Sequence, residues 1–572
     1  MSTETRRRGA RTIVSGGAVA ALVLATPMGG PAAAKDQVYY VPISKSWTVT
    51  GHGYGHGHGL SQYGAQGAAL QGKTYRQILG FYYPGTARSQ VKGRVRVLIS
   101  ADTTSDLQVR PGKTLKVRDL ESGDVWSLPT DRSINRWRLR AANDTTAVHY
   151  HDARGWHRWR IPDGGGPLLG AVQFERRGPL TLLVPGGSDV VGRAYRGALR
   201  LAKPYPGADV RDTVNVLSMD AYVQGVVPYE MPTSWEQQAL RSQAVAARTY
   251  ATWQRAQNPR RYYQICDTTA CQVYGGVGAE VRSSNDAVQA TAGEILTYGG
   301  KPAFTQFSAS SGGWTSAGSV PYLPAKQDPY DDFPGNSVHT WTTKVSAASL
   351  EALHPNIGRL VKLRVTQREG HGQWGGRVRQ IVLDGTAGTA YMTGDDFRWH
   401  FGLRSSWFSI APTPIIVRWR KIGGAKSIVG RPRSGEYAID RGAVQEFEKG
   451  RIFWSSSTGA RELKGNVLRA YRDFGGPSSR LGWPVTGMLQ AGEHGRTARF
   501  QGGRIYASRA TDGHVLYGPI LKRYRQEGGP TSWIGFPATN VRELADGDKR
   551  ARFQHAVLTF DASTHEVQVR RL

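Results

Sequence analysis

Short apolar runs typical of buried strands recur through the first two thirds of the chain. Val, Leu and Ile dominate them, and turn-forming Gly, Pro, Asn and Asp lie between them. Few stretches in this region repeat with the spacing of a helix. The pattern predicts an α+β fold that is rich in β structure. Strands are expected at 95–99, 180–184, 214–217, 360–365 and 378–383.

One long segment has the pattern of a helix. It runs from about Trp235 to Ala256, is rich in Ala and Leu, and stops before a proline. Thr233 and Glu236 have the spacing of a capping box, which would begin the helix. A second helix is expected within 385–412, ahead of a Pro-Thr-Pro linker.

The last third of the chain carries an internal repeat with a period of 52 to 53 residues. Its Gly-x-Pro turns have their central glycines at Gly430, Gly482 and Gly535. A Phe-centred block and a Gly-Gly-Pro block recur in phase with these turns. Each unit is expected to form a short helix that ends at Gly-Gly, a turn and a hairpin. The repeat predicts a small domain over 413–572, after a larger domain over 35–412.

The N-terminus has the pattern of a signal peptide. Four arginines precede an apolar stretch from about Ile13 to Pro27, and three alanines end at Ala34. The pattern predicts cleavage after residues 1–34. No later run reaches the roughly 20 apolar residues that span a bilayer, so no transmembrane anchor is expected after cleavage. We therefore expect an exported protein.

The chain is strongly basic. It has 74 Lys and Arg residues against 44 Asp and Glu, a formal charge of +30, and without residues 1–34 the charge is about +27. An exported protein meets anionic wall polymers and phospholipid head groups before nucleic acid. Anionic cell-wall polymers are therefore the expected partners of the basic surface, and nucleic-acid binding is not expected.

Only two cysteines occur, Cys266 and Cys271. In an oxidising compartment a disulfide is the first expectation, and so small a loop would contribute about 2 kcal/mol. Zinc ligation is the second reading, but zinc needs four ligands and no histidine lies in this loop. Free thiols are the third. No cofactor is expected otherwise.

The most informative stretch runs from Asp220 to Ala251 and contains Gly-Val-Val-Pro-Tyr-Glu230-Met-Pro. It resembles the signature of the SpoIID/LytB family, the stage II sporulation protein D type, in which a glutamate after Gly-Val-Val-Pro is catalytic. Other marks of that family lie at 195–197, 271–276, 307–315, 321–323 and 397–405, so the resemblance covers most of residues 45–410.

The resemblance implies a lytic transglycosylase that cuts peptidoglycan glycan strands without water. Glu230 would protonate the leaving oxygen and then accept the proton of the sugar's own 6-hydroxyl. A glycosidase that uses a second carboxylate needs two such groups, whereas here one suffices. Glu230 must hold a proton near neutral pH, which requires burial. The dipole of the predicted helix and the charge of Arg248 would oppose this, and the reading of Glu230 as a mere helix cap stays open.

Three further residues of this motif are candidate substrate ligands. Arg248 is kept in the family pattern, and its planar guanidinium could orient Glu230 or bind an acetamido or lactyl group. Gln243 and Tyr250 are weaker candidates. The alternative for an arginine in mid-helix is a solvated surface residue.

Near the predicted mature N-terminus, three histidines, His52, His56 and His58, alternate with glycines. With the two cysteines they could complete a zinc site, but only His56 falls on a position of the family motif. A glycine-rich loop that lets glycan approach the backbone is favoured, with His56, Ser61 and Gln62 bonding sugars or shaping the site.

Motif order sets this chain apart. In sporulation-type members the glycine-histidine motif follows the Leu-Arg-Ser segment, whereas here it precedes every other motif. The order resembles a permuted arrangement of the same domain. Residues 101–192 carry no recognised family mark, and an inserted β subdomain is the reading for them.

The C-terminal units resemble LGFP repeats, which are found on secreted actinobacterial proteins and thought to attach them to the wall. The chain is therefore expected to be secreted, wall-associated and bound to peptidoglycan. Two alternatives remain open. One is a non-catalytic wall-binding or amidase-enhancing protein, and the other is a muramidase that uses water with Asp220 or Glu236 as second carboxylate.

Overall fold

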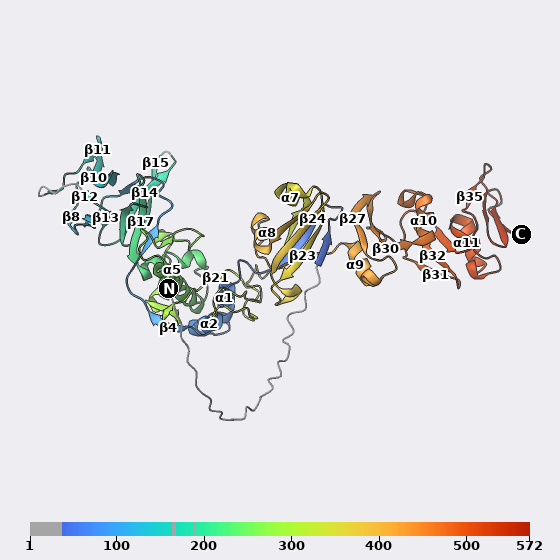
Figure 1. The fold of residues 1–572 in the computed structure, drawn as a ribbon, viewed down its shortest axis with the longest axis horizontal. Coiled ribbons are helices and arrows are strands. Elements are labelled where there is room, and N and C mark those ends of the chain that lie inside the picture. The colour runs from blue at the N-terminus through green and yellow to red at the C-terminus, as the bar shows by residue number, and fades with distance from the viewer. Residues whose placement is uncertain (1–36, 163–167, 188) are drawn as a thin grey trace, which may run out of the picture. The chain divides into compact units, whose positions relative to one another are not determined.

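The computed structural model describes residues 37–162, 168–187 and 189–572 (Figure 1). The expected signal peptide, residues 1–34, lies outside the described residues. Among the residues described, no helix is both long enough and apolar enough to cross a membrane.

Helix α5 (Gln237–Gln257) is the centre around which the Glu230 region is built. Its alanine-rich faces are almost fully buried, because small side chains let neighbouring elements approach closely. Among the elements that pack on it are α1 (Gln62–Leu70), α2 (Tyr75–Tyr82), α3 (Met219–Gln224), α6 (Arg282–Ala290) and β19 (Glu294–Tyr298).

The helix predicted at 235–256 is confirmed, but its expected cap is wrong. The N-cap of α5 is Glu236, and no side chain forms the reciprocal capping box with Thr233. Residues Pro232 to Trp235 form a separate turn. The Glu236 backbone N–H donates instead to Gln66 Oε1 on α1, at 2.9 Å. A tertiary contact has replaced the local one.

A seven-stranded sheet lies beside α5, in the order β18-β5-β17-β16-β13-β7-β8. The strands predicted at 95–99 and 214–217 are confirmed as β5 and β17. The bounds are β5 (Arg94–Leu98), β7 (Lys116–Asp119), β8 (Val125–Ser127), β13 (Val172–Glu175), β16 (Ala198–Ala202), β17 (Asp212–Ser218) and β18 (Ile265–Cys266).

Residues 101–192 are β-rich as expected, but part of them extends this same sheet, because β13 pairs with β16. The rest form a second sheet in the order β11-β10-β9-β6-β14-β15, with β12 beside β10. The strand predicted at 180–184 is confirmed as β14 of this second sheet. The bounds are β6 (Asp106–Val109), β9 (Arg136–Ala142), β10 (Thr145–Asp152), β11 (Gly155–Arg158), β12 (Leu168–Leu169), β14 (Leu180–Gly186) and β15 (Asp189–Tyr195).

Both chain regions 37–52 and 340–410 contribute to one further α+β unit. Strand β2 (Ser46–His52) lies between β22 (Thr340–Ser346) and β26 (Phe408–Ile410). The strands predicted at 360–365 and 378–383 are confirmed, and a short helix, α8, forms within 385–412. The other bounds are β1 (Gln37–Tyr40), β23 (Leu360–Arg368), β24 (Val378–Gly385), β25 (Thr389–Thr393), α7 (Ala347–Leu353) and α8 (Gly394–His400).

This strand pairing places the glycine-histidine segment, 51–59, beside the Leu-Arg-Ser segment, 403–405. Gly55 N–H donates to the Arg404 carbonyl at 2.9 Å, and His52 N–H donates to the Trp407 carbonyl at 2.9 Å. The two motifs are adjacent in space although they lie about 350 residues apart in sequence. A permuted order stays a prediction, and this adjacency is what it requires. Two small sheets lie outside this unit. One has the order β20 (Lys301–Pro302), β19, β4 (Ala87–Gln90), and the other pairs β3 (Leu60–Ser61) with β21 (Phe307–Ser308).

The C-terminal repeat forms three units, each a helix followed by a four-stranded antiparallel sheet. The helices are α9 (Pro414–Lys421), α10 (Gly465–Asp473) and α11 (Gly518–Gln526). The first sheet is β27 (Pro432–Ile439), β28 (Gly442–Phe447), β29 (Gly450–Ser455) and β30 (Gly459–Lys464). The second is β31 (Leu489–Ala491), β32 (Gly495–Arg499), β33 (Arg504–Ser508) and β34 (Asp512–Leu516), and the third is β35 (Arg542–Glu543), β36 (Lys549–Arg552), β37 (Ala556–Phe560) and β38 (Val567–Arg571).

The same hydrogen bond recurs in each unit and ties the helix to the Gly-x-Pro turn. Tyr471 Oη donates to the Gly482 carbonyl at 2.8 Å, and Tyr524 Oη donates to the Gly535 carbonyl at 2.8 Å. In the first unit a tryptophan indole N–H makes the equivalent bond to Gly430 at 2.8 Å. The repeat period therefore follows from a repeated contact as well as from a repeated core.

Replacing either tyrosine by phenylalanine should loosen its turn. Tyr471→Phe leaves the Gly482 carbonyl without its buried donor, and we expect a loss of about 1 kcal/mol in local stability. Native-state hydrogen exchange should become faster at 480–484. Tyr437→Phe, whose hydroxyl bonds Glu446 at the surface, is the control and should leave exchange unchanged. Unchanged exchange in Tyr471→Phe would show that the bond does not hold the turn.

Candidate functional site

Glu230 is the last residue of the short helix α4 (Val227–Glu230) and precedes the turn that leads into α5. Its Oε2 accepts a hydrogen bond from Gln62 Nε2 at 3.2 Å. Gln62 is the first residue of α1 and is only 7% exposed. The preceding residue, Tyr229, is 58% exposed. The carboxyl is therefore held from one side, beside a solvent-facing aromatic ring.

Helix α1 contacts the segment from Glu230 to Glu236 at three points. The Tyr63 and Trp235 rings pack edge to face with centroids 4.9 Å apart. One turn further on, Gln66 accepts the Glu236 backbone N–H. Together with the Gln62 bond, three contacts from α1 fix the chain on both sides of the turn.

Burial decides the protonation of Glu230. It raises the pKa of the Glu230 carboxyl to about 7, and the Gln62 hydrogen bond lowers the pKa by less. Of the two features expected to oppose a proton, the Arg248 guanidinium is bound to Asp220, and the start of α5 is held one turn of α1 further along than Glu230. The carboxyl can thus carry a proton near neutral pH.

Arg248 is a core residue, which corrects its expected role as a substrate ligand. The side chain is 0% exposed, and Nε donates to Asp220 Oδ1 at 2.7 Å. Its two terminal nitrogens donate to the carbonyls of Glu294, at 3.0 Å, and Val288, at 3.2 Å. Burial lowers the pKa of Arg248, and Asp220 opposes this shift. Its guanidinium ties α5 to three other elements and is not free to bind a sugar.

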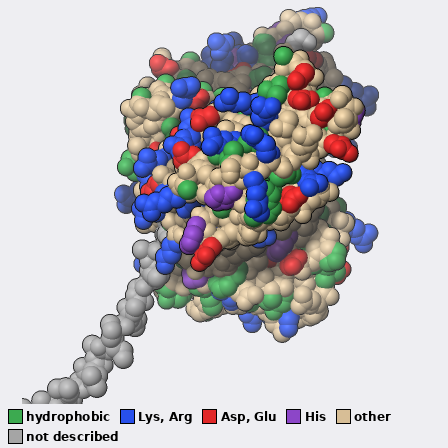
Figure 2. Space-filling model, turned by 90° about the vertical axis from the view of Figure 1, so that its right-hand side faces the viewer, with side chains coloured by type: hydrophobic (Ala, Val, Ile, Leu, Met, Phe, Trp, Pro, Cys, Tyr) green, Lys and Arg blue, Asp and Glu red, His purple; other side chains and the backbone are tan. Residues whose placement is uncertain are grey.

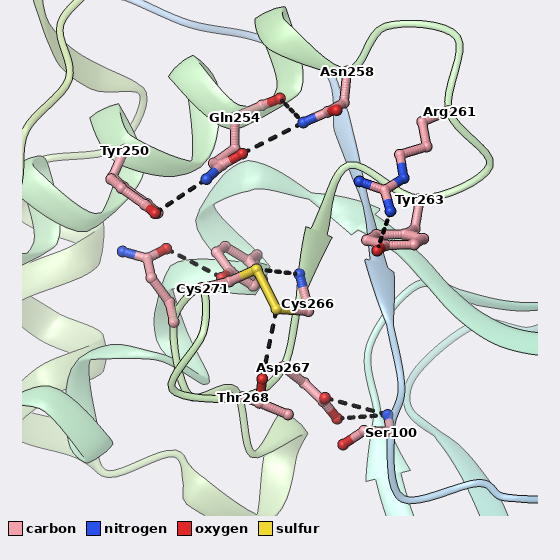
Figure 3. Close-up of a disulfide and its surroundings, with 12 residues drawn as sticks. Ser100, Tyr250, Gln254, Asn258, Arg261, Tyr263, Cys266, Asp267, Thr268 and Cys271 are labelled. Atoms are coloured by element: carbon pink, nitrogen blue, oxygen red, sulfur yellow. Dashed lines mark hydrogen bonds between the residues drawn. A yellow bond between two sulfur atoms is a disulfide. The ribbon is translucent and has the colours of Figure 1, made fainter. Parts of the chain in front are cut away.

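Gln243 and Tyr250 do not form a ligand site with Arg248. Gln243 is 0% exposed, which rules out the expected sugar contact, and its amide has no hydrogen-bond partner within the described part of the chain. Tyr250 is half-buried, its ring stacks on Phe304 with centroids 5.9 Å apart, and its hydroxyl accepts from Gln254 (Figure 3).

The three histidines of the glycine-rich segment have separate partners. His52 Nε2 lies 2.6 Å from Gln373 Oε1, and His58 Nδ1 lies 3.2 Å from the Ser316 carbonyl. His56 Nδ1 accepts the His58 backbone N–H at 2.9 Å. Burial, with the charges of His58 and two arginines, lowers the pKa of His56 to about 3, so its ring is neutral at physiological pH. Within the described residues no three His, Cys, Asp or Glu side chains gather as metal ligands.

Ser61 is buried and structural, contrary to the expected sugar contact. It is 1% exposed, caps α1 by accepting the Gly64 N–H at 3.0 Å, and donates to Asp331 Oδ1 at 2.6 Å. The Gln62 amide donates to Glu230 and does not face the solvent as a free sugar ligand would. Both residues therefore belong to the support of the site.

The buried carboxylate of Asp331 is the residue that sequence reasoning missed. It is 0% exposed, and hydrogen bonds, led by that from His339, outweigh the effect of burial and keep its pKa below the ordinary value. It lies within a loop, where carboxylates are usually solvated, so its sequence gave no signal. Its partners are Ser61 Oγ, Ser310 Oγ, Ser311 N, Gly312 N, Asn336 Nδ2 and His339 Nδ1, at 2.6 to 3.0 Å.

Cys266 and Cys271 form a disulfide at the end of β18 (Figure 3). Sulfur atoms joined to each other are not available to zinc as thiolates. The loop between them presents Asp267, whose carboxylate accepts the Ser100 N–H at 3.1 Å. The disulfide therefore stabilises a loop that is anchored to β5 and its continuation.

Comparisons with known proteins identify two parts of the chain. Residues 208–298 match the family model of the stage II sporulation protein, SpoIID, and residues 429–479 and 481–532 match the LGFP repeat. The first match contains Glu230, α5 and both cysteines. The other two fall within the repeat units described above.

Individual relatives match over part of their length. The amidase enhancer of Bacillus subtilis is 40% identical over 135 residues, 23% of this chain and 17% of that protein. The stage II sporulation protein D of Bacillus amyloliquefaciens is 29% identical over 240 residues, 38% of this chain and 64% of that protein. That of Bacillus subtilis is 32% identical over 142 residues, 21% of this chain and 41% of that protein. The chain thus spans less than two thirds of each.

Removing the Arg248 guanidinium should cost stability and not substrate affinity. Arg248→Met leaves Asp220 and two carbonyls without their donor, and we expect the free energy of unfolding to fall by about 3 kcal/mol in denaturant titrations. Arg241→Met on the same helix, where no hydrogen bond is formed by the guanidinium Nε, is the control and should cost less. Unchanged stability together with a raised KM would indicate that Arg248 binds the substrate.

Glu230→Gln should stabilise the protein at alkaline pH. The folded pKa is about 7 and lies above the ordinary value of 4.5, so ionisation of Glu230 destabilises the fold increasingly from pH 4.5 to 7 and fully above. The variant should gain about 3 kcal/mol over the wild type at pH 8.5 and nothing at pH 4. Denaturant titrations at both values measure this. The exposed Glu121→Gln is the control, and an equal gain there would mean that Glu230 is not desolvated.

Proposed function

Because the chain carries a SpoIID domain ahead of LGFP repeats, we propose that it is an exported, wall-anchored lytic transglycosylase that cleaves peptidoglycan glycan strands. The observation that carries this proposal is the carboxyl of Glu230. It is buried enough to be an acid near neutral pH, and it stands beside an exposed aromatic residue.

In the proposed reaction one carboxyl serves twice. Glu230 gives its proton to the glycosidic oxygen as the bond from that oxygen to the muramic acid C1 breaks. The resulting carboxylate then accepts the proton of the sugar's 6-hydroxyl, whose oxygen attacks C1 and closes a 1,6-anhydro ring. Water is not consumed, and Glu230 ends the cycle protonated again. A pKa near 7 suits both steps, because neither protonation state is costly there.

The surroundings of Glu230 favour this chemistry over a muramidase. Burial and the Gln62 bond account for the shift in its pKa, with no contribution from a second carboxylate. Asp220, a candidate partner, is held by Arg248 and by the Gly293 N–H, and Glu236 is an exposed N-cap. A hydrolase of the two-carboxylate kind needs a second acid aimed at the same bond.

Other site residues have supporting roles in this proposal. Gln62 is a positioning residue, since its amide fixes one carboxyl oxygen and leaves the other for the substrate. His56 is neutral and fully engaged, so it shapes the glycine-rich loop and does not exchange protons. The LGFP repeats would hold the enzyme on the wall, and Lys and Arg side chains spread across the face in Figure 2 favour an anionic surrounding.

The second candidate is a non-catalytic amidase enhancer. Its support is the relative of that name, which is 40% identical over 135 residues. In that case the chain would bind wall material through the same domain and leave cleavage to a partner. The two candidates differ in whether the purified chain releases products by itself.

Digestion of purified peptidoglycan distinguishes the candidates. We expect anhydro-muropeptides by mass spectrometry from sacculi, intact or stripped of stem peptides, and a rate that falls as pH rises above about 7, because the acid must be protonated. Glu230→Gln should lose at least about 100-fold in kcat, in keeping with general acid catalysis. Glu236→Gln is the matched control and should keep its rate.

Each other outcome has a definite meaning. Products with reducing ends would indicate the muramidase, and no products from either substrate would favour the amidase enhancer. A Glu230→Gln enzyme with undiminished cleavage would remove Glu230 from the mechanism. The stability assay on the same variant shows separately whether the carboxyl is desolvated.

A further inference from the structure

One face of the seven-stranded sheet carries cations on both sides of a small apolar cluster, Ala198, Ala202, Val214 and Val216, against which Tyr262 and Tyr263 pack. Side chains alternate along a strand, so residues two apart share a face. The pairing register places Arg200 opposite Gln173 and Gln173 opposite Arg118. The basic sheet face is defined by Arg94, Lys116, Arg118 and Arg200, whereas the opposite face carries buried Val95, Val97, Val117, Phe174 and Leu199.

A hollow of about 890 Å³ lies over the basic sheet face. Seven Lys and Arg side chains line it, because Arg176, Arg177 and Arg196 join those of the sheet, and the lining holds one carboxylate, Glu175. A concave surface of one sign concentrates its field and attracts counterions. The hollow begins where α3 follows β17, at Ser218 and Ala221.

Most of these cations have no carboxylate partner. Arg118 pairs with Glu175 at 2.9 Å, and Arg196 pairs with Glu280 at 2.7 Å. Within the described residues, the salt bridges include none for Arg94, Lys116, Arg176, Arg177 or Arg200. Arg200 is half-buried and bonds only the amide oxygen of Gln173, at 3.1 and 3.3 Å. A half-buried guanidinium whose only hydrogen-bond partner is a neutral amide keeps its charge uncompensated and can bind an anion.

We infer that this hollow binds a polymer with repeated phosphate groups, such as an anionic wall polymer. The cations extend from β5 across three strands to β7, about 19 Å at the usual strand spacing. One phosphate cannot reach them all, whereas a chain of phosphates can. Arginine matches phosphate with paired N–H donors.

The lining argues against the other polyanions. It contains no Trp, Tyr or Phe on which the bases of single-stranded nucleic acid could stack. It is concave and holds few apolar side chains, unlike a surface that inserts into lipid. The inference goes beyond the proposed cleavage and does not depend on it, because no residue of the hollow is part of the Glu230 site.

The test measures binding of end-labelled linear inorganic polyphosphate to the full exported chain by fluorescence anisotropy over a range of salt concentrations. The site variant is Arg94→Gln/Lys116→Gln/Arg200→Gln. The control, Lys45→Gln/Lys301→Gln/Lys344→Gln, removes the same charge from exposed positions elsewhere. We expect Kd to rise at least about 10-fold in the site variant and less than about 2-fold in the control, with a shallower salt dependence in the site variant only.

Several results would overturn the inference. One is an equal rise in the Kd for polyphosphate in the site variant and the control. Another is tighter binding of single-stranded DNA or polyglutamate than of polyphosphate. The third is tighter binding of anionic vesicles than of polyphosphate. If the site variant fails to fold, Arg94→Gln/Lys116→Gln/Arg177→Gln changes only exposed side chains and should show the same loss. Normal glycan cleavage by the site variant separates this result from the proposed catalytic function.

Discussion

The hydrogen bonds that converge on the buried carboxylate of Asp331 are the interaction on which the Glu230 site depends. A carboxylate without exposure is tolerated only when all its acceptor positions are filled by strong donors. Six donors fill them, from Ser61 and from the segments 310–312 and 336–339. One of these donors is Ser61, which also caps α1. The start of α1 is therefore fixed by a charge in the core and not by its own sequence alone.

From that fixed start, α1 determines the environment of Glu230. Its first residue bonds the carboxyl, its second packs on Trp235, and its fifth accepts the N–H at the start of α5. Glu230 ends one short helix and α5 begins seven residues later, so the carboxyl is not part of the first turn of α5. Burial is then the main influence on its pKa. A support made of uncharged side chains from α1 lets the Glu230 carboxyl hold a proton without a charged neighbour.

The arginines of this basic chain fall into two kinds that composition does not distinguish. Arg248 is enclosed, with a carboxylate and two carbonyls around it, and its charge serves the packing of α5. Arg94 and Arg200 lie on the opposite face of the sheet from its main core, where burial and, after it, the charges of Arg96 and Arg94 lower the pKa of Arg200 to about 10. The first kind is satisfied within the chain, and the second is left to meet an anion from outside. Net charge alone therefore says little about where a polyanion binds.

The sequence by itself determined the local elements and the repeat, and the family resemblance singled out Glu230 as the candidate acid. Strands β5, β17 and β24 and helix α5 follow from the local periodicity of apolar residues. The repeat of 52 to 53 residues follows from short motifs that recur in phase. Both kinds of pattern depend on residues that are neighbours in the chain. Tertiary structure alone decided the rest. Arg248, Gln243 and Ser61 became core residues, Gln62 turned to Glu230, and Asp331 became the centre of the support. The Ser61–Asp331, Gln62–Glu230 and Arg248–Asp220 contacts join residues 270, 168 and 28 positions apart, which no local pattern specifies.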